Sequence, residues 1–143
     1  MATDRKAEVT WQGDLMSGSG RIDSVSSGAI GGLDVDWRAR SEDVGSKTSP
    51  EELIAAAHAS CVSMALSNGL AQAGHPAEEL KTSATVTFQP GEGITKIALS
   101  VEGRVPGVDE EAFRTAAEGA KANCPVSKAL AGVPEITLDA KLT

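Results

Sequence analysis

The chain has 143 residues, a net charge of −7 and 41% hydrophobic residues. Its length fits a single domain, residues 1–143, and its hydrophobic content is sufficient for a core. An acidic chain without a Lys/Arg cluster excludes nucleic acid and anionic membrane surfaces as expected partners, because either would need a basic face. The first residues lack the apolar run of a secretory signal, and no segment approaches the length that spans a bilayer, so we expect a cytoplasmic protein.

The N-terminal third is predicted to be β-structure. Short alternating segments at 7–11 and 21–25 are separated by Gly/Ser turns. The segment 33–40 alternates strictly between apolar and charged residues, which is typical of a half-buried antiparallel strand. A polar loop is expected at 41–49.

A long helix is predicted from Pro50 to about Ala73. Ser49 is the expected N-cap, Pro50 fits the first helical position, and Glu52 completes a capping box. Gly74 follows the last helical residue, as is common at helix ends. Because the helix is rich in small residues and apolar over much of its circumference, we expect it to be central and largely buried.

The C-terminal half alternates between strands and helices. Two strands joined by the turn PGEG precede a helix that Asp109 is expected to cap, and a short helix beginning at Pro125 precedes a last strand. These elements are predicted at 81–89, 94–105, 106–123, 125–132 and 135–142. The order of strands and helices along the chain indicates an α+β fold.

The two cysteines, Cys61 and Cys124, are the candidate reactive groups. Their separation is not the spacing of a zinc site, and without a secretion signal a structural disulfide is not the default. They are either inert buried residues or thiols that form a transient, catalytic disulfide. Cys124 directly precedes Pro125 and so lies at or next to the N-cap of the short helix. Backbone N–H groups would stabilise a thiolate there, which makes Cys124 the more acidic thiol on local physics alone.

Cys61 lies about three turns into its helix, so its activation must come through space. His58 either pairs with Cys61 or hydrogen-bonds into the core. A carboxylate would raise the pKa of a thiol, so Glu51 makes sense only as the group that orients a cation. Arg40 or Arg38 is the candidate, because an arginine held by a carboxylate could stabilise a Cys61 thiolate and polarise a peroxide oxygen.

The chain resembles the OsmC/Ohr family, named for osmotically inducible protein C and the organic hydroperoxide resistance protein. The resemblance rests on TSPEELIAAAHASCVSMAL, ITKIALSVEGRVPGVD, AKANCPVSKAL, EITLDAKL and the N-terminal WQGDLMSGSGRI. It covers nearly the whole chain in order, and ITKIAL and VPG place it closer to the OsmC branch. The resemblance implies an intertwined homodimer with antiparallel sheets around long central helices and active sites at the subunit interface.

The resemblance also implies a thiol-dependent peroxidase that reduces organic hydroperoxides, and hydrogen peroxide, without metal, haem or flavin. Cys61 would be the peroxidatic cysteine, whose sulfenic acid condenses with the resolving Cys124 to a disulfide. Glu51 matches the arginine-orienting carboxylate. In the family the catalytic arginine lies in an R-x-E segment before the long helix. Arg40-Ser41-Glu42 matches this segment best, and Arg38 lies two residues away. An external dithiol or a thioredoxin-like reductant would reset the pair.

Three alternatives remain. A peroxide-responsive redox sensor or binding module would form the same disulfide without turnover. A thiol–disulfide oxidoreductase acting on proteins is disfavoured because the chain lacks a Cys-x-x-Cys motif. A structural domain would carry two inert thiols. Peroxide consumption beyond one equivalent per subunit, with a dithiol present, separates the enzyme from the sensor.

Overall fold

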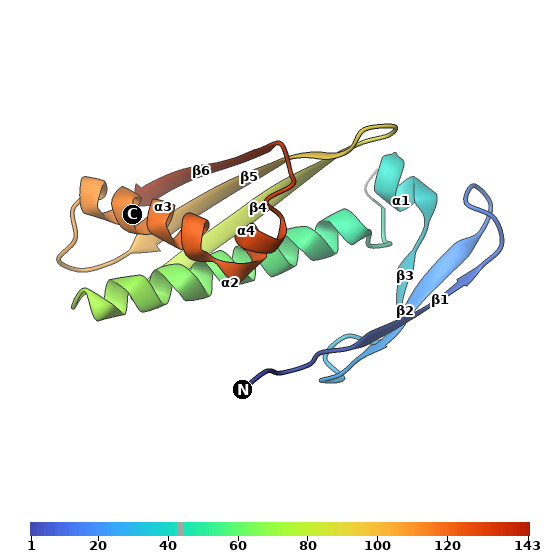
Figure 1. The fold of residues 1–143 in the computed structure, drawn as a ribbon, viewed down its shortest axis with the longest axis horizontal. Helices are drawn as coiled ribbons and strands as arrows, with labels where there is room; N and C mark the ends of the chain where they lie inside the picture. The colour runs from blue at the N-terminus through green and yellow to red at the C-terminus, as the bar shows by residue number, and fades with distance from the viewer. Residues whose placement is uncertain (43–44) are drawn as a thin grey trace. The chain divides into compact units, whose positions relative to one another are not determined.

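The computed structural model describes residues 1–42 and 45–143, which form two compact units, Met1–Leu53 and Ile54–Thr143 (Figure 1). The elements in order are β1 Ala7–Gln12, β2 Ser19–Val25, β3 Leu33–Val35, α1 Trp37–Ser41, α2 Pro50–Gln72, β4 Glu79–Gln89, β5 Gly93–Arg104, α3 Glu110–Asn123, α4 Pro125–Ala129 and β6 Glu135–Leu142. Two separate sheets and a long helix confirm the α+β class. That both units belong to one domain, residues 1–143, stays a prediction.

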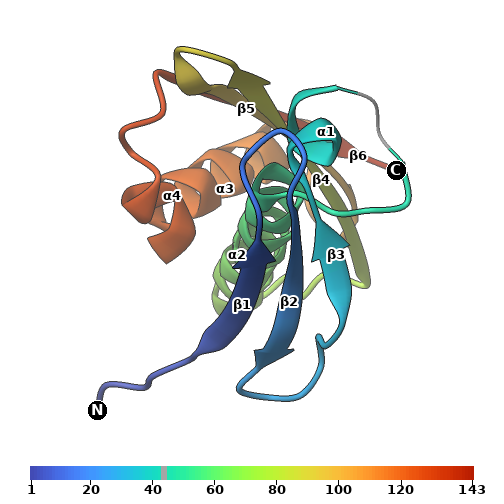
Figure 2. The ribbon, with the colours of Figure 1, turned by 90° about the vertical axis from the view of Figure 1, so that its right-hand side faces the viewer.

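The first unit is built on a three-stranded sheet of order β1-β2-β3, in which both strand pairs are antiparallel (Figure 2). Ile22 of β2 is buried, but all six residues of β1 are exposed, including Val9 and Trp11. Three strands with so little buried apolar surface are marginal on their own. This sheet therefore needs further apolar contact to be stable.

The prediction of one continuous strand over 33–40 is wrong after its third residue. Strand β3 spans Leu33–Val35 only, and Trp37–Ser41 forms the short helix α1. The reason is Asp36, whose backbone is extended and whose carboxylate accepts a hydrogen bond from the Ala39 N–H at 2.8 Å. This N-cap starts a helix where the alternation alone favoured a strand.

The change affects both candidate arginines. Arg38 and Arg40 lie on helix α1 and not on the polar face of a strand. The predicted polar loop at 41–49 includes residues 43–44, which lie outside the described residues.

Helix α2 begins at the predicted residue and ends within one residue of the predicted end. The Ser49 hydroxyl accepts a hydrogen bond from the Glu52 N–H at 3.2 Å, as an N-cap does. The Glu52 carboxylate itself accepts from the Thr48 hydroxyl at 2.9 Å. At the other end Gly74 has a φ of 88°, the left-handed conformation that glycine adopts most easily.

The expectation that α2 is largely buried is wrong for the single chain. Its buried residues from the second turn onward form one stripe, His58, Val62, Leu66 and Leu70, at four-residue spacing. Met64, on another face, is 72% exposed. The apolar composition of α2 therefore exceeds what one subunit covers.

The expectation that no segment approaches membrane-spanning length is also corrected. With 23 residues and a mean hydropathy of 1.3 over 18 of them, α2 has the length and composition of a span. This is weak evidence for a membrane, because the core helix of a soluble protein has the same character.

The second unit contains a three-stranded sheet of order β4-β5-β6. Strands β4 and β5 are antiparallel, as predicted, but β6 pairs with β5 in parallel, so this sheet is mixed. The reason is the intervening α3 and α4, which carry the chain back to the starting end of the sheet before β6 begins. Along β5 the buried residues alternate, with Ile97, Leu99 and Val101 on one face.

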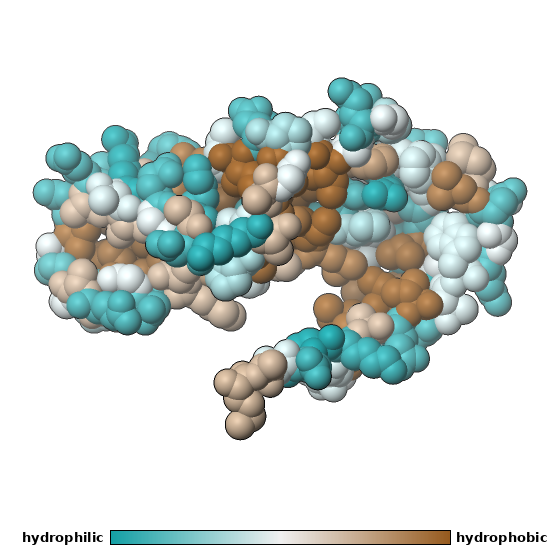
Figure 3. All heavy atoms as spheres, viewed as in Figure 1, coloured by the Kyte–Doolittle hydropathy of each residue, from teal (hydrophilic) through white to brown (hydrophobic). Residues whose placement is uncertain are grey.

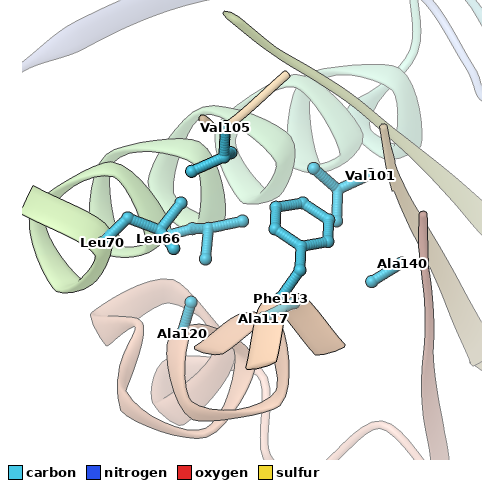
Figure 4. Packing of buried hydrophobic residues seen from close by; sticks show 8 residues of the cluster. All are labelled: Leu66, Leu70, Val101, Val105, Phe113, Ala117, Ala120 and Ala140. Carbon is cyan, nitrogen blue, oxygen red and sulfur yellow. The ribbon is translucent and has the colours of Figure 1, made fainter. Parts of the chain in front are cut away.

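Two apolar clusters hold this unit together. The first surrounds the fully buried ring of Phe113 (Figure 4). It draws on α2, α3, β5, β6 and the residue after β5, and contains Leu66, Leu70, Val101, Val105, Phe113, Ala117, Ala120 and Ala140. The second contains Val62, Ile97, Leu99 and Cys124, and Cys61 packs against it. The second cluster is where the two cysteines meet.

Gly103 of β5 allows the Phe113 ring to lie against the sheet. A methyl group added at Gly103 would lie 2.5 Å from the ring and 3.1 Å from Leu80. We expect Gly103→Ala to lower the free energy of unfolding by about 1–3 kcal/mol, because an overpacked core must shift. Urea denaturation measures the change. Gly119→Ala, in α3, is the control, since a methyl there meets nothing within 4 Å. Equal stabilities of the two variants would contradict this packing.

Candidate functional site

The structure places Cys61 and Cys124 in direct contact. Both are free thiols; Cys61 is half-buried on α2, and Cys124 is fully buried between α3 and α4. Cys61 packs against the apolar cluster that contains Cys124, and the two thiols are close enough for each to shift the pKa of the other. Residues that are distant in sequence are thus brought together by the packing of α2 against the α3–α4 junction.

The surroundings of the thiols are aliphatic. Apart from Cys61 itself, the partly buried residues packed against their cluster come from α2, the two edge strands β4 and β6, α4 and the segment after α4, namely Ile54, Ala65, Ala84, Val86, Val126, Leu130, Val133, Ile136 and Leu138. Such an environment disfavours an isolated charge, so each thiolate depends on specific hydrogen-bond donors.

The two thiols differ in acidity. Burial raises the pKa of the Cys61 thiol, and its hydrogen bond to Cys124 raises that pKa further. Burial also opposes ionisation of Cys124, but the hydrogen bond from Cys61 and the nearby donors of Ser127 and Val126 outweigh it, so the Cys124 pKa is lowered. Cys124 forms no regular side-chain cap on α4, so the N–H groups of that helix act as nearby dipoles. The directions of these two shifts agree with Cys124 as the more acidic thiol, which stays a prediction.

His58 contacts a serine and not the cysteine three residues after it. It is fully buried, and its Nε2 lies 2.6 Å from the hydroxyl oxygen of Ser127. Of the two interpretations of His58, the hydrogen bond into the core is the one the structure shows. Burial lowers the pKa of His58, which favours the neutral ring. Ser127 was not predicted from the sequence. Its position three residues after Cys124, at the start of a predicted helix, is the feature that could have indicated a contact with that cysteine.

Arg40 and Glu51 form a partly buried ion pair within the first unit. The Arg40 Nε lies 3.1 Å from each carboxylate oxygen of Glu51, whose side chain is 8% exposed. Arg38 instead pairs with Glu42 at 3.0 Å, and both of those side chains are well exposed. Of the two candidate arginines, the structure therefore pairs Arg40 with the carboxylate at the start of α2. The arginine pair lies in one unit and the cysteine pair in the other.

The second unit places two free thiols together. One thiol is partly accessible, the other is buried, and they pack together in one cluster, and closeness of two thiols is what disulfide formation requires. Among the described residues no group of three or more His, Cys, Asp or Glu side chains could hold a metal ion.

Comparison with known proteins gives the family. The family described as OsmC-like protein matches residues 43–139. The chain is 43% identical to Peroxiredoxin OsmC of Escherichia coli (strain K12), over 99% of each chain, and equally to Peroxiredoxin OsmC of Shigella flexneri. The chain therefore belongs to the OsmC family, as its motifs indicated.

Solved structures share its fold. An OsmC-like protein of unknown function from Vibrio cholerae matches with a TM-score of 0.72 and 16% identity, over 97% of this chain and 99% of that one. The organic hydroperoxide resistance protein OhrB of Bacillus subtilis matches with a TM-score of 0.63 and 23% identity, over 96% and 98%. At these identities the likeness concerns the fold alone.

Proposed function

We propose that the protein is a cysteine-based hydroperoxide reductase that acts on organic hydroperoxides and also on hydrogen peroxide. The observation that carries this proposal is the contact between a partly accessible Cys61 and a buried, acidic Cys124. The name Peroxiredoxin OsmC, borne by relatives that are 43% identical, supports it.

Accessibility and acidity select different roles for the two sulfurs. Cys124 ionises first, but it is fully buried and a peroxide cannot reach it. Cys61 is accessible, and a thiolate on the neighbouring Cys124 can accept its proton, so that Cys61 becomes the nucleophile. The Cys61 thiolate then attacks one peroxide oxygen. The O–O bond breaks, Cys61 becomes a sulfenic acid, and the departing alkoxide takes the proton from Cys124 and leaves as an alcohol.

The second step joins the two cysteines in a disulfide. The Cys124 thiolate attacks the sulfur of the Cys61 sulfenic acid, the S–O bond breaks, and hydroxide leaves and is protonated to water. The product is a Cys61–Cys124 disulfide. An external dithiol or a thioredoxin-like reductant then returns both residues to thiols, so no metal, haem or flavin takes part in this cycle.

Arg40 is the proposed source of positive charge for Cys61. The local environment raises the pKa of Cys61, so its thiolate needs a cation to be populated. A guanidinium can stabilise the thiolate and the negative charge that develops on the departing oxygen. Glu51 holds the Arg40 side chain by its Nε, which supports the role of Glu51 as the residue that orients it.

The proposed assembly is a cytoplasmic homodimer. Strand β1 is fully exposed with Val9 at 58% and Trp11 at 41%, and apolar surface is visible over β2 and β3 in Figure 3. Helix α2 likewise leaves apolar surface uncovered. A second copy of the chain would cover such surface. We expect light scattering to give the mass of two chains at micromolar concentration; the mass of one chain, 14.6 kDa, would contradict the dimer.

The test of the function is turnover. Purified protein is supplied with excess tert-butyl hydroperoxide and either dithiothreitol or no reductant, and the remaining peroxide is measured over time. We expect many equivalents to be consumed with the dithiol and about one equivalent per subunit without it. Consumption that stops at one equivalent in both samples would identify a redox sensor, and no consumption would identify a structural domain.

A further inference from the structure

A buried hydrogen bond leads from α2 to the cysteine pair. His58 Nε2 and Ser127 Oγ are 2.6 Å apart, His58 is fully buried, and Ser127 is 9% exposed. Ser127 lies in the first turn of α4, three residues after Cys124, and residues at this spacing are neighbours on a helix surface. The three side chains therefore form a row from His58 through Ser127 to Cys124, the sulfur that contacts Cys61.

The other ring nitrogen of His58 indicates which atom donates the hydrogen bond between His58 and Ser127. Its Nδ1 is buried and has no hydrogen-bond partner among the described residues. A buried N–H without an acceptor is rarer than a buried acceptor without a donor, so the proton of the neutral ring belongs on Nε2. The Nε2–H then donates to the Ser127 oxygen. This leaves the single Ser127 proton available for another acceptor.

The Cys124 sulfur, three residues earlier at the N-cap of the same short helix, is a neighbouring acceptor for that proton. The Ser127 hydroxyl is one of the groups that lower the pKa of Cys124, and the N–H groups of Ser127 and Val126 act in the same direction. Because the sulfur lies in an aliphatic cluster, each such donor matters more than it would in water.

We propose that His58 and Ser127 are positioning residues for the resolving step: His58 orients the Ser127 hydroxyl so that it donates to Cys124 and holds that sulfur ready to attack the Cys61 sulfenic acid. This inference rests on the proposed function. In the step, the Cys124 electron pair forms the S–S bond, the S–O bond of Cys61 breaks, and hydroxide leaves to be protonated to water. The Cys124 sulfur is oxidised and the Cys61 sulfur is reduced.

The first test measures how the sulfenic acid partitions. Protein is treated with one equivalent of tert-butyl hydroperoxide in the presence of dimedone, which traps sulfenic acids, and the ratio of dimedone adduct to disulfide is measured by mass spectrometry. We expect Ser127→Ala to raise this ratio about tenfold, because a hydrogen bond to a charged group is lost. His58→Phe should raise the ratio by a similar factor, and the double variant should raise it no further than either single variant. His58→Gln keeps a donor near the Nε2 position and should leave the ratio as in the unchanged protein.

The matched control is Ser63→Ala. Ser63 is a partly buried serine of α2 whose hydroxyl bonds to Ala59 and Thr82 and not to a sulfur. It should lose comparable stability in a thermal melt and leave the ratio unchanged. A ratio that rises equally in Ser63→Ala, or that does not change in Ser127→Ala, would overturn the inference while peroxide turnover continued.

The second test does not depend on peroxide. The chain has two histidines, so ¹⁵N NMR of the imidazole rings resolves both, with His75 as the internal reference. We expect the Nε2–H tautomer for His58; the Nδ1–H tautomer or a charged ring at neutral pH would overturn the inference. If the protein consumed no peroxide, the proposed function would fail, and this spectrum would still decide how the hydrogen bonds are directed.

Discussion

Cys61→Ser is expected to lose catalytic hydroperoxide reduction by a factor on the order of 10³ or more, because a serine hydroxyl at neutral pH does not attack an O–O bond. The substitution is small, and Cys61 is only half-buried. The loss should therefore come without a large change in stability. The measurement is the rate of tert-butyl hydroperoxide consumption with excess dithiothreitol, together with a thermal melt.

Cys124→Ser is the matched variant and should fail differently. Cys61 still reacts with the first equivalent of peroxide, more slowly because Cys124 no longer accepts its proton, but its sulfenic acid has no neighbouring thiol to condense with. We expect dimedone to label Cys61 and excess peroxide to oxidise it further to the sulfinic acid. If Cys124→Ser could not react with the first equivalent while Cys61→Ser could, the roles assigned to the two cysteines would be reversed.

Arg40→Lys is expected to lower the rate of the first step about 10²-fold. Lysine keeps the positive charge but lacks the planar guanidinium of arginine. A guanidinium has several N–H donors, so it can bind a carboxylate and the substrate at once. Glu51→Gln should lower the rate by a similar factor, because the amide weakens the hold on Arg40. The rate is measured in single turnover by stopped flow, from the loss of free thiol.

Arg38→Lys is the control for this pair of variants. Arg38 lies on the same short helix, and its partner Glu42 is exposed, so its loss should leave the rate within a factor of about two. The double variant Arg40→Lys, Glu51→Gln should be no slower than the slower single variant if the two residues act as one unit. Equal losses in the Arg38 and Arg40 variants would remove the proposed role of the Arg40–Glu51 pair.

Local sequence signals predicted the elements whose ends are determined by nearby residues. The Ser49 cap and Gly74 define α2, and the Asp109 carboxylate caps α3 through the Ala112 N–H, as expected. The last strand has the predicted bounds, Glu135–Leu142. Each of these features depends on a few residues along the chain, so each can be recognised without the fold.

The errors arose where a competing local or long-range interaction dominates. Asp36 caps a helix inside a segment whose alternation favoured a strand. Strand β6 pairs in parallel because α3 and α4 return the chain to the end of the sheet where β5 begins. The sequence of a single segment does not encode this path. The burial of α2 was overestimated because apolar residues lie on faces that one subunit does not cover.

The candidate site was only partly predictable. Cys61, Cys124, Glu51 and the two candidate arginines stood out by their chemistry, and the family resemblance supplied their roles and favoured Arg40. The position of Cys124 before Pro125 predicted its acidity. Their roles stay predictions. The hydrogen bond between His58 and Ser127 joins residues 69 positions apart, so only the folded chain places them together.

The central claim is that one peroxide molecule converts Cys61 and Cys124 into a disulfide. The most direct measurement treats reduced protein with one equivalent of tert-butyl hydroperoxide, quenches it within seconds under denaturing conditions with a thiol-blocking reagent, and maps the peptides by mass spectrometry. The account predicts loss of both thiols and a linked peptide containing Cys61 and Cys124. Two blocked thiols and no linked peptide after minutes would contradict it, and would mean that this chain keeps the OsmC fold without its peroxide chemistry.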